Sequence, residues 1–240
     1  MKKIANILLF AVLVAIFIGV LLNINVTTKQ CINYQCYTYK LPLYLKILDF
    51  FDRHYNYKQL VGSITKDATN EQERVMKIFE WTYENIKKVP AGFSVIDDHV
   101  WYIIIRGYGV SDQASDVFTT LCNYAGIDAF YTWVMTPDCS KKVPLSFVKI
   151  KDKWYIFDPY NSVYFKNKQG YLADLETIRS NNACLIESKY NEPMIDYTIY
   201  FNSLPSIKEV GLIGLNRANI QSPFKRFIFE IKKRINKLLL

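Results

Sequence analysis

Residues 107–127 read GYGVSDQASDVFTTLCNYAGI, and this pattern predicts the centre of the fold. After two closely spaced glycines, Ser111 begins a run whose apolar residues recur at helical spacing up to Gly126, a typical helix stop. Asp112 and Asp116 fall in the first turns, where carboxylates complement the positive end of the helix dipole. The stretch therefore predicts a helix that presents Ser111 at its N-terminus.

The residues around this helix predict an α+β fold. Downstream, residues 127–135, 143–150 and 154–157 are rich in β-branched and aromatic side chains, which is typical of strands, and residues 151–153 form a tight antiparallel turn. Upstream, a capping-box pattern predicts a helix over roughly 71 to 87. A short helix, capped by Asp97 or Asp98, and an apolar helix near residues 43–51 are also expected. Helices beside a meander of antiparallel strands make an α+β architecture.

Two motifs carry a family resemblance. The stretch from residue 107 to residue 127 resembles the nucleophile helix of the transglutaminase-like superfamily, which shares the core of papain-like cysteine proteases. The second motif, residues 148–159 with Trp154 and Asp158-Pro159, resembles the family's hairpin that ends in Trp-x-x-x-Asp-Pro. The resemblance covers roughly residues 70 to 165. It implies a transglutaminase-like core, a nucleophile helix packed on an antiparallel sheet.

The resemblance also implies a catalytic triad, from which this sequence departs. The family uses a cysteine thiolate, a histidine that activates it and an aspartate that orients the histidine. Ser111 stands at the cysteine position, and counting back through the hairpin places the histidine position at Val143, or at Leu145 after a two-residue slip. Asp158 alone keeps the family identity. We therefore expect a non-catalytic domain whose former active-site cleft binds a protein or a cell-envelope polymer.

Two alternatives stay open. The first is a serine-dependent acyltransferase or hydrolase, in which Ser111 is the nucleophile and His99, on the short helix before it, is the base. The second is a structural subunit of an envelope complex. No cofactor is expected. With only His54 and His99 in the chain, and no second pair beside Cys31-x4-Cys36, the sequence offers no zinc site.

The N-terminus predicts a membrane anchor. Lys2 and Lys3 precede an apolar run that extends from Ile4 to about Val26, long enough to cross a bilayer. A cleaved signal peptide is the alternative, but the run lacks a convincing cleavage site. The positive-inside rule places the N-terminus in the cytoplasm and the domain outside, as a single-pass membrane protein. Anchored members of the resembled family often belong to bacterial envelope or polysaccharide systems.

The expected organisation is an anchor at 1–26, a polar linker at 27–41, a transglutaminase-like domain at 42–205 and a basic amphipathic helix within 206–240. This last helix suits a membrane surface, although an apolar face packed on the domain would show the same pattern. Cys31 and Cys36 form a disulfide or stay as two linker thiols; the sequence leaves both open.

The net charge of +8 arises from Lys and Arg that are scattered among acids, except at the C-terminus. We therefore expect membrane lipid, and a protein or an envelope polysaccharide or peptide, as partners. Nucleic acid is not expected, because no zinc-finger, helix-turn-helix or RNA-recognition signature accompanies the charge.

Overall fold

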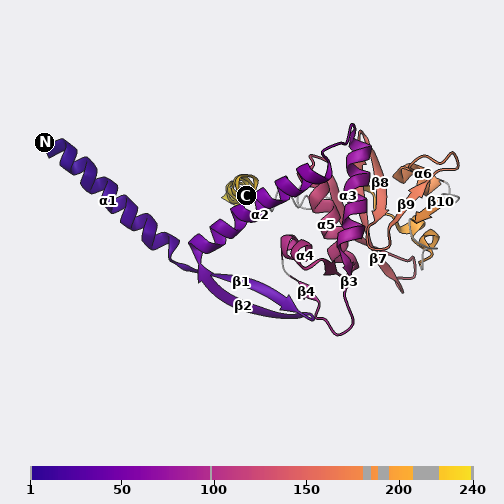
Figure 1. Cartoon of the computed structure of the whole chain (residues 1–240), viewed down its shortest axis with the longest axis horizontal. Helices are drawn as coiled ribbons and strands as arrows, with labels where there is room; N and C mark the ends of the chain where they lie inside the picture. The colour runs from indigo at the N-terminus through magenta and orange to yellow at the C-terminus, as the bar shows by residue number, and fades with distance from the viewer. Residues whose placement is uncertain (1, 98, 181–184, 189–194, 208–221, 239–240) are drawn as a thin grey trace.

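The computed structural model describes residues 2–97, 99–180, 185–188, 195–207 and 222–238. Asp98, one of the two expected helix caps, and Cys184 lie outside these ranges. Figure 1 shows a long N-terminal helix, a hairpin and a mixed helix-and-sheet domain. The α+β prediction is confirmed.

Helix α1 (Lys2–Leu22) is apolar along its whole length. Its segment Lys3–Leu22 has a mean hydropathy of 2.9 and no buried residue, and it extends away from the domain (Figure 1). At 1.5 Å per residue, its length matches the roughly 30 Å hydrocarbon core of a bilayer. By length and composition, it is the one helix of the described residues that could cross a membrane.

The segment expected as a linker forms a β-hairpin instead. Strands β1 (Asn25–Ile32) and β2 (Gln35–Pro42) pair antiparallel, and β4 (Ile96–Asp97) adds a third strand beside β1. The turn residues Asn33 and Tyr34 both have positive φ, 48° and 67°, as a two-residue turn of type I′ requires. No glycine marks this turn, so the sequence carried no ordinary hairpin signal.

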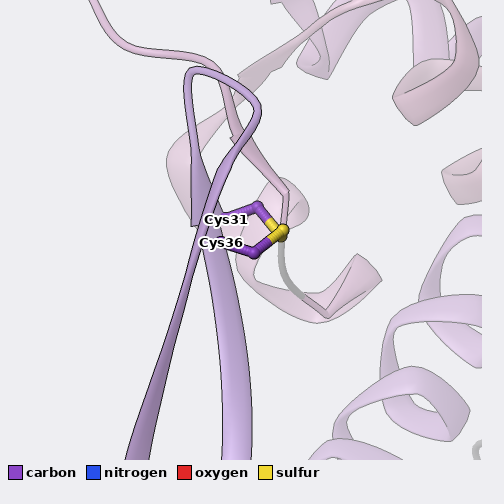
Figure 2. Close-up of a disulfide and its surroundings, with 2 residues drawn as sticks. All are labelled: Cys31 and Cys36. Atoms are coloured by element: carbon purple, nitrogen blue, oxygen red, sulfur yellow. A yellow bond between two sulfur atoms is a disulfide. The ribbon is translucent and has the colours of Figure 1, made fainter.

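A disulfide closes the tip of this hairpin. Cys31 and Cys36 are cross-strand partners next to the turn, and their sulfurs are bonded (Figure 2). This settles the alternative that the sequence left open. Of the remaining cysteines that the structure describes, Cys122 is free and buried, and Cys139 is free and exposed.

The helices of the domain come next in the chain. They are α2 (Leu43–Ile64), α3 (Glu71–Asn85), α4 (Val100–Arg106) and α5 (Ser111–Tyr124). The Asn70 side chain accepts a hydrogen bond from the Glu73 backbone, and Glu73 accepts one from the backbone of Thr69, which explains why α3 starts there. The residue that precedes α4 is His99, and Gly107, at φ 72°, ends it in the left-handed conformation.

An antiparallel sheet of five strands follows, in the order β10-β9-β8-β7-β6. The strands are β6 (Ala129–Met135), β7 (Lys142–Ile150), β8 (Lys153–Asp158), β9 (Val163–Lys166) and β10 (Leu185–Ser188). The first three match the predicted strands, whereas β9 and β10 were not predicted. Short strands β3 (Lys87–Lys88) and β5 (Tyr108–Gly109) pair in parallel outside this sheet.

Each face of the sheet buries its own apolar cluster. Val148, Ile150 and Phe157 pack with residues of α2, α3 and α5. The alternate residues along β7 and β8 face the other way, toward α6 (Leu175–Ser180) and the 3₁₀-helix η1 (Tyr197–Ser203). The sheet is thus a layer between the nucleophile-helix side and the η1 side.

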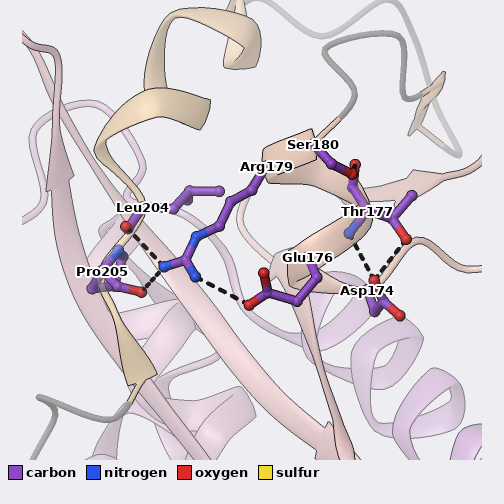
Figure 3. Close-up of polar contacts among 7 residues, drawn as sticks. All are labelled: Asp174, Glu176, Thr177, Arg179, Ser180, Leu204 and Pro205. Carbon is purple, nitrogen blue, oxygen red and sulfur yellow. Dashed lines mark hydrogen bonds and ion pairs between the residues drawn. The ribbon is translucent and has the colours of Figure 1, made fainter.

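Polar contacts attach the segment that follows η1 to α6. Arg179 of α6 donates to the backbone carbonyls of Leu204 and Pro205 and pairs with Glu176 (Figure 3). Asp174 caps α6 by accepting from the Thr177 backbone at 2.8 Å. These contacts hold η1 in place over its face of the sheet.

Candidate active site

Ser111 is the first residue of α5, as predicted, and is half-buried. Gly109 is needed two residues earlier because of a close approach. A Cβ built there would lie 2.9 Å from Oε1 of Gln113 and 3.3 Å from Cγ2 of Ile103. Gln113 accepts a hydrogen bond from the Val110 backbone at 3.2 Å, which satisfies a donor at the start of the helix. The glycine thus leaves room for the Gln113 and Ile103 side chains at the start of the helix.

Gln113 also connects the start of α5 to the disulfide-closed hairpin. Its Nε2 donates to the carbonyl of Ile96 at 2.6 Å, and Ile96 on β4 pairs with Ile32 of the hairpin. Asp97, the next residue, pairs with Cys31. One wall of the Ser111 region is therefore built on the tip of the hairpin, an arrangement that no local sequence signal indicated.

Charged groups surround the start of α5. Burial raises the pKa of Asp112, and the negative charge of Asp97 raises it further, while hydrogen bonding from the Gln113 backbone and the positive charge of Lys142 lower it. Lys142 begins β7 and lies over the ring of Trp133, 4.6 Å from its centroid. The start of β7 therefore lies near the start of α5, although the two belong to different layers.

The predicted histidine position holds only apolar groups. Val143 is 3% exposed and Leu145 is 2% exposed. Both belong to the apolar cluster on the η1 side of the sheet, whereas α5 packs on the other face. Neither side chain can carry a proton.

Asp158 is buried on this same η1 side, because it follows Phe157, which faces α5. Its Oδ1 accepts from the backbone amides of Tyr160 at 3.0 Å and Asn161 at 3.2 Å. Its Oδ2 accepts from the Asn161 side chain at 2.9 Å and from the Tyr197 hydroxyl at 2.6 Å. Burial raises the pKa of Asp158, and these four hydrogen bonds oppose the shift. Tyr197 thus donates to the aspartate that orients the histidine in the family, and no motif in the sequence pointed to it.

Within the described residues, neither histidine has a recorded contact with Ser111. His99 lies near α2: burial and the charge of Arg53 lower its pKa to about 4, while Asp49 has the opposite effect. His54 Nδ1 is 3.0 Å from the hydroxyl of Tyr124, at the far end of α5 and about 20 Å from Ser111 along the helix axis. For the part of the chain that the structure describes, no hydrogen bond of the Ser111 hydroxyl is recorded. The role of His99 as a base stays a prediction.

The largest of the recorded grooves does not lie at this site. It has a volume of about 890 Å³ and runs between the start of α3 and the β7–β8 hairpin, where Glu71 accepts from the Lys151 backbone. The lining of this groove does not include Ser111. Volume alone therefore does not identify the family's catalytic position.

Part of the chain matches a known protein family. Residues 58–159 match the family model described as the transglutaminase-like superfamily. The matched region begins within α2, contains α3, α4 and α5, and ends one residue after Asp158. These residues therefore form a transglutaminase-like region, as the two motifs predicted. The family match does not establish activity.

Solved structures resemble parts of the chain. A candidate protease from Parabacteroides distasonis is 17% identical, with a TM-score of 0.37, over 45% of this chain and 25% of its own. A candidate cysteine protease from Cytophaga hutchinsonii is 16% identical, with a TM-score of 0.39, over 57% and 47%. A protein described only as a TGase is 9% identical, with a TM-score of 0.36, over 55% and 43%. The chain thus spans less than half of each structure. No curated protein matches it.

Proposed function

We propose that this chain is a membrane-anchored, non-catalytic transglutaminase-like protein whose former active-site cleft binds a protein or a cell-envelope polymer. The observation that carries the proposal is the environment of Asp158. Its carboxylate, 1% exposed, already accepts four hydrogen bonds, one of them from Tyr197. Such a carboxylate stabilises a turn and a neighbouring element, and an imidazole would have to displace one of its present donors.

The environment of Ser111 also supports the absence of catalysis. A serine hydroxyl is a poor nucleophile unless a base takes its proton. The dipole of α5 favours an anion at Ser111, but it is far too weak to ionise a hydroxyl near neutral pH. Because Val143 and Leu145 are apolar and the recorded side-chain neighbours of His99 are on α2 and α4, no imidazole is recorded beside this hydroxyl among the described residues.

The side chains near Ser111 are suited to binding. Trp133 is 39% exposed, Met135 is 47% exposed, and Lys142 lies over the Trp133 ring. Near β5, just before Ser111, Phe93 is 59% exposed and packs edge-on against Tyr108 at 5.6 Å. Exposed aromatic rings with nearby cations suit a peptide or a sugar polymer that carries acidic groups.

The anchor and its orientation belong to the same proposal. Helix α1 has the length and composition of a membrane span, and Lys2 and Lys3 precede its apolar run. Under the positive-inside rule, the domain is then outside the cytoplasm, where the Cys31–Cys36 disulfide would persist and where envelope polymers are found.

Binding without turnover is the test. Full-length protein in lipid nanodiscs is titrated calorimetrically with soluble peptidoglycan fragments and, separately, with an acidic cell-wall polysaccharide. At least one ligand should bind, and mass spectrometry should recover it unchanged. Trp133→Ala should weaken binding by about tenfold, as expected for an aromatic contact at the centre of an interface.

Two matched controls make the result specific. Tyr171→Ala removes an aromatic ring that is 73% exposed, and Lys168→Gln removes an exposed lysine, both outside the Ser111 region. Both variants should bind normally, whereas Lys142→Gln should bind more weakly. The proposal is wrong if neither ligand binds, if Trp133→Ala and Tyr171→Ala have equal effects, or if a bound ligand is cleaved by the wild type but not by Ser111→Ala.

A further inference from the structure

The C-terminal helix α9 (Pro223–Leu238) exposes its apolar stripe instead of burying it. A terminal helix that packs its apolar face on a domain hides that face from solvent. Here five large side chains stay exposed by 41% to 66%: Phe224, Phe227, Ile228, Ile231 and Ile235. The domain-packing alternative therefore accounts for little of this helix.

Among the described residues, the recorded contacts of α9 with the domain come from its first turn. The ring of Phe224 meets Phe51 of α2 edge-on, with centroids 6.0 Å apart. The charge of Lys225 lowers the pKa of His54 on α2, after the larger effects of burial and Lys58. The helix is thus held against α2 at its start.

Helix α2 begins where α1 would leave the bilayer. The Leu43 backbone donates to the carbonyl of Ile24 at 2.9 Å, so α2 starts beside the end of α1. The first turns of α2 expose Tyr44, Leu45 and Leu48, by 37%, 43% and 60%. Phe51, where α9 attaches, is only about 12 Å further along α2.

The arrangement of the three helices agrees with a common membrane surface. In Figure 1, α9 is seen along its axis on the side of α2 that faces α1, whereas α1 is seen from the side. The axes of the two helices are therefore far from parallel. A helix whose axis is steeply inclined to a membrane-spanning helix, and which is attached near that helix's exit point, can lie along the surface of the bilayer.

We propose that α9 lies in the headgroup region of the leaflet from which α1 emerges, and that the surface it binds is anionic phospholipid. Its apolar stripe would enter the acyl boundary, and its basic residues would face lipid phosphates. The helical segment has one acid, Glu230, and six basic residues: Lys225, Arg226, Lys232, Lys233, Arg234 and Lys237. This charge favours an anionic surface over the same helix of a second copy, which would repel it.

The two attachments reinforce each other. Because α1 would hold α9 close to the bilayer, lipid binding by α9 becomes an intramolecular step that needs only modest affinity. The basic charge does not oppose export, since long domains are translocated largely regardless of charge. Attachment at α1 and α9 would fix the orientation of the domain relative to the membrane.

Photo-crosslinking in reconstituted full-length protein tests the proposal. Phe227 is replaced by p-benzoylphenylalanine, and the protein is placed in vesicles that contain phosphatidylglycerol. Irradiation should give lipid adducts, identified by mass spectrometry. The same probe at Tyr171, an exposed residue outside α2 and α9, should give none.

The charge dependence is tested with matched pairs. Lys225→Gln with Lys232→Gln should shift the equilibrium between lipid-bound and released α9 toward release by about 25-fold. Each basic residue near the surface raises the binding constant for anionic lipid by about fivefold. Lys66→Gln with Lys168→Gln, an equal charge change at exposed residues off α9, should leave the adduct yield unchanged. Salt should lower the wild-type yield.

Two results would overturn the inference. In the first, the probe at position 227 crosslinks only to protein. In the second, the yield of lipid adducts depends neither on the α9 charges nor on phosphatidylglycerol. The inference rests on α1 spanning the bilayer, which is part of the proposed function. Resistance to alkaline carbonate extraction reports that insertion separately, so a failure of α9 to bind lipid is distinguishable from a failure of the anchor.

Discussion

The Tyr197 hydroxyl donates a 2.6 Å hydrogen bond to Oδ2 of Asp158, and both side chains are buried. Asp158 ends β8, and Tyr197 begins η1, 39 residues further along the chain. In the family that this region resembles, the aspartate orients a histidine; here it holds η1 against the sheet. Asp158 thus has a structural role in this fold.

The first prediction concerns this bond. Tyr197→Phe keeps the ring but removes one donor from a buried carboxylate, and it should lower the free energy of unfolding by about 1.5–3 kcal/mol. Chemical denaturation measures the change. Tyr200→Phe is the control, since Tyr200 is also buried, at 3% exposed, and its hydroxyl has no hydrogen bond recorded among the described residues. An equal loss in both variants would contradict a specific role for Tyr197.

The second prediction is a loss of stability in mild acid. The pKa of His99 in the folded protein is lowered to about 4, chiefly by burial. The unfolded chain therefore takes up a proton at His99, near its ordinary pKa of 6.5, before the folded chain does. The free energy of unfolding is thus highest above pH 6.5 and decreases as the pH falls toward 4. The full shift corresponds to about 3 kcal/mol, and partial exposure of the ring reduces this to about 1–2 kcal/mol. His99→Gln should flatten this part of the curve of unfolding free energy against pH. An unchanged curve would mean that His99 is well solvated.

The third prediction concerns the hairpin. Removing the Cys31–Cys36 bond by Cys31→Ser with Cys36→Ser should destabilise the hairpin by about 2 kcal/mol, given its short loop. Because β4 pairs with β1 and accepts from Gln113, hydrogen exchange should rise at residues 96–97 and at the start of α5. Exchange in β7 and β8 should stay as it was. A change confined to the hairpin would show that the tip does not support the Ser111 region.

The fourth prediction concerns the predicted histidine position. Ser111→Cys alone should react slowly with iodoacetamide, because a thiol without an imidazole is mostly protonated near neutral pH. Val143 lies in the cluster on the η1 side of the sheet and α5 packs on the other face, so adding Val143→His should leave this rate nearly unchanged. Adding Tyr197→Phe, which frees Asp158, should not raise it either.

This labelling must be read at residue 111 itself. Cys139 is a free, exposed thiol and would react in every variant, so a Cys139→Ser background and peptide mapping are needed. Val143 is buried in an apolar cluster, and circular dichroism must show that the histidine variants fold. If the thiol introduced by Ser111→Cys reacts much faster once Val143→His is added, the imidazole does reach residue 111, and Val143 is the vacated histidine position.

The elements that were predictable from sequence depend on local signals. The capping residues before α3, the glycines around α5 and the tight turn between β7 and β8 act within a few residues, and the structure confirms all three elements. The family match over residues 58–159 agrees with the two motifs.

The features that could not be predicted from the sequence depend on contacts between segments that are distant in the chain. Strand β1 pairs with β2 through a turn without glycine, and Gln113 reaches Ile96 only in the folded chain. Tyr197 lies in a segment without a motif, so its bond to Asp158 could not be predicted. The sequence correctly identified Ser111 as the first residue of its helix, but it carried no information on what surrounds the hydroxyl.

The most direct measurement of the central claim is the reaction of Ser111 with a serine-directed electrophile. Wild-type protein and Ser111→Ala are incubated with a fluorophosphonate and compared by intact mass and by peptide mapping. With no imidazole recorded beside the hydroxyl in the described part of the chain, we expect no adduct on residue 111 above the level of a denatured control. A stoichiometric adduct on Ser111 that is absent from Ser111→Ala would contradict it and would establish a serine enzyme.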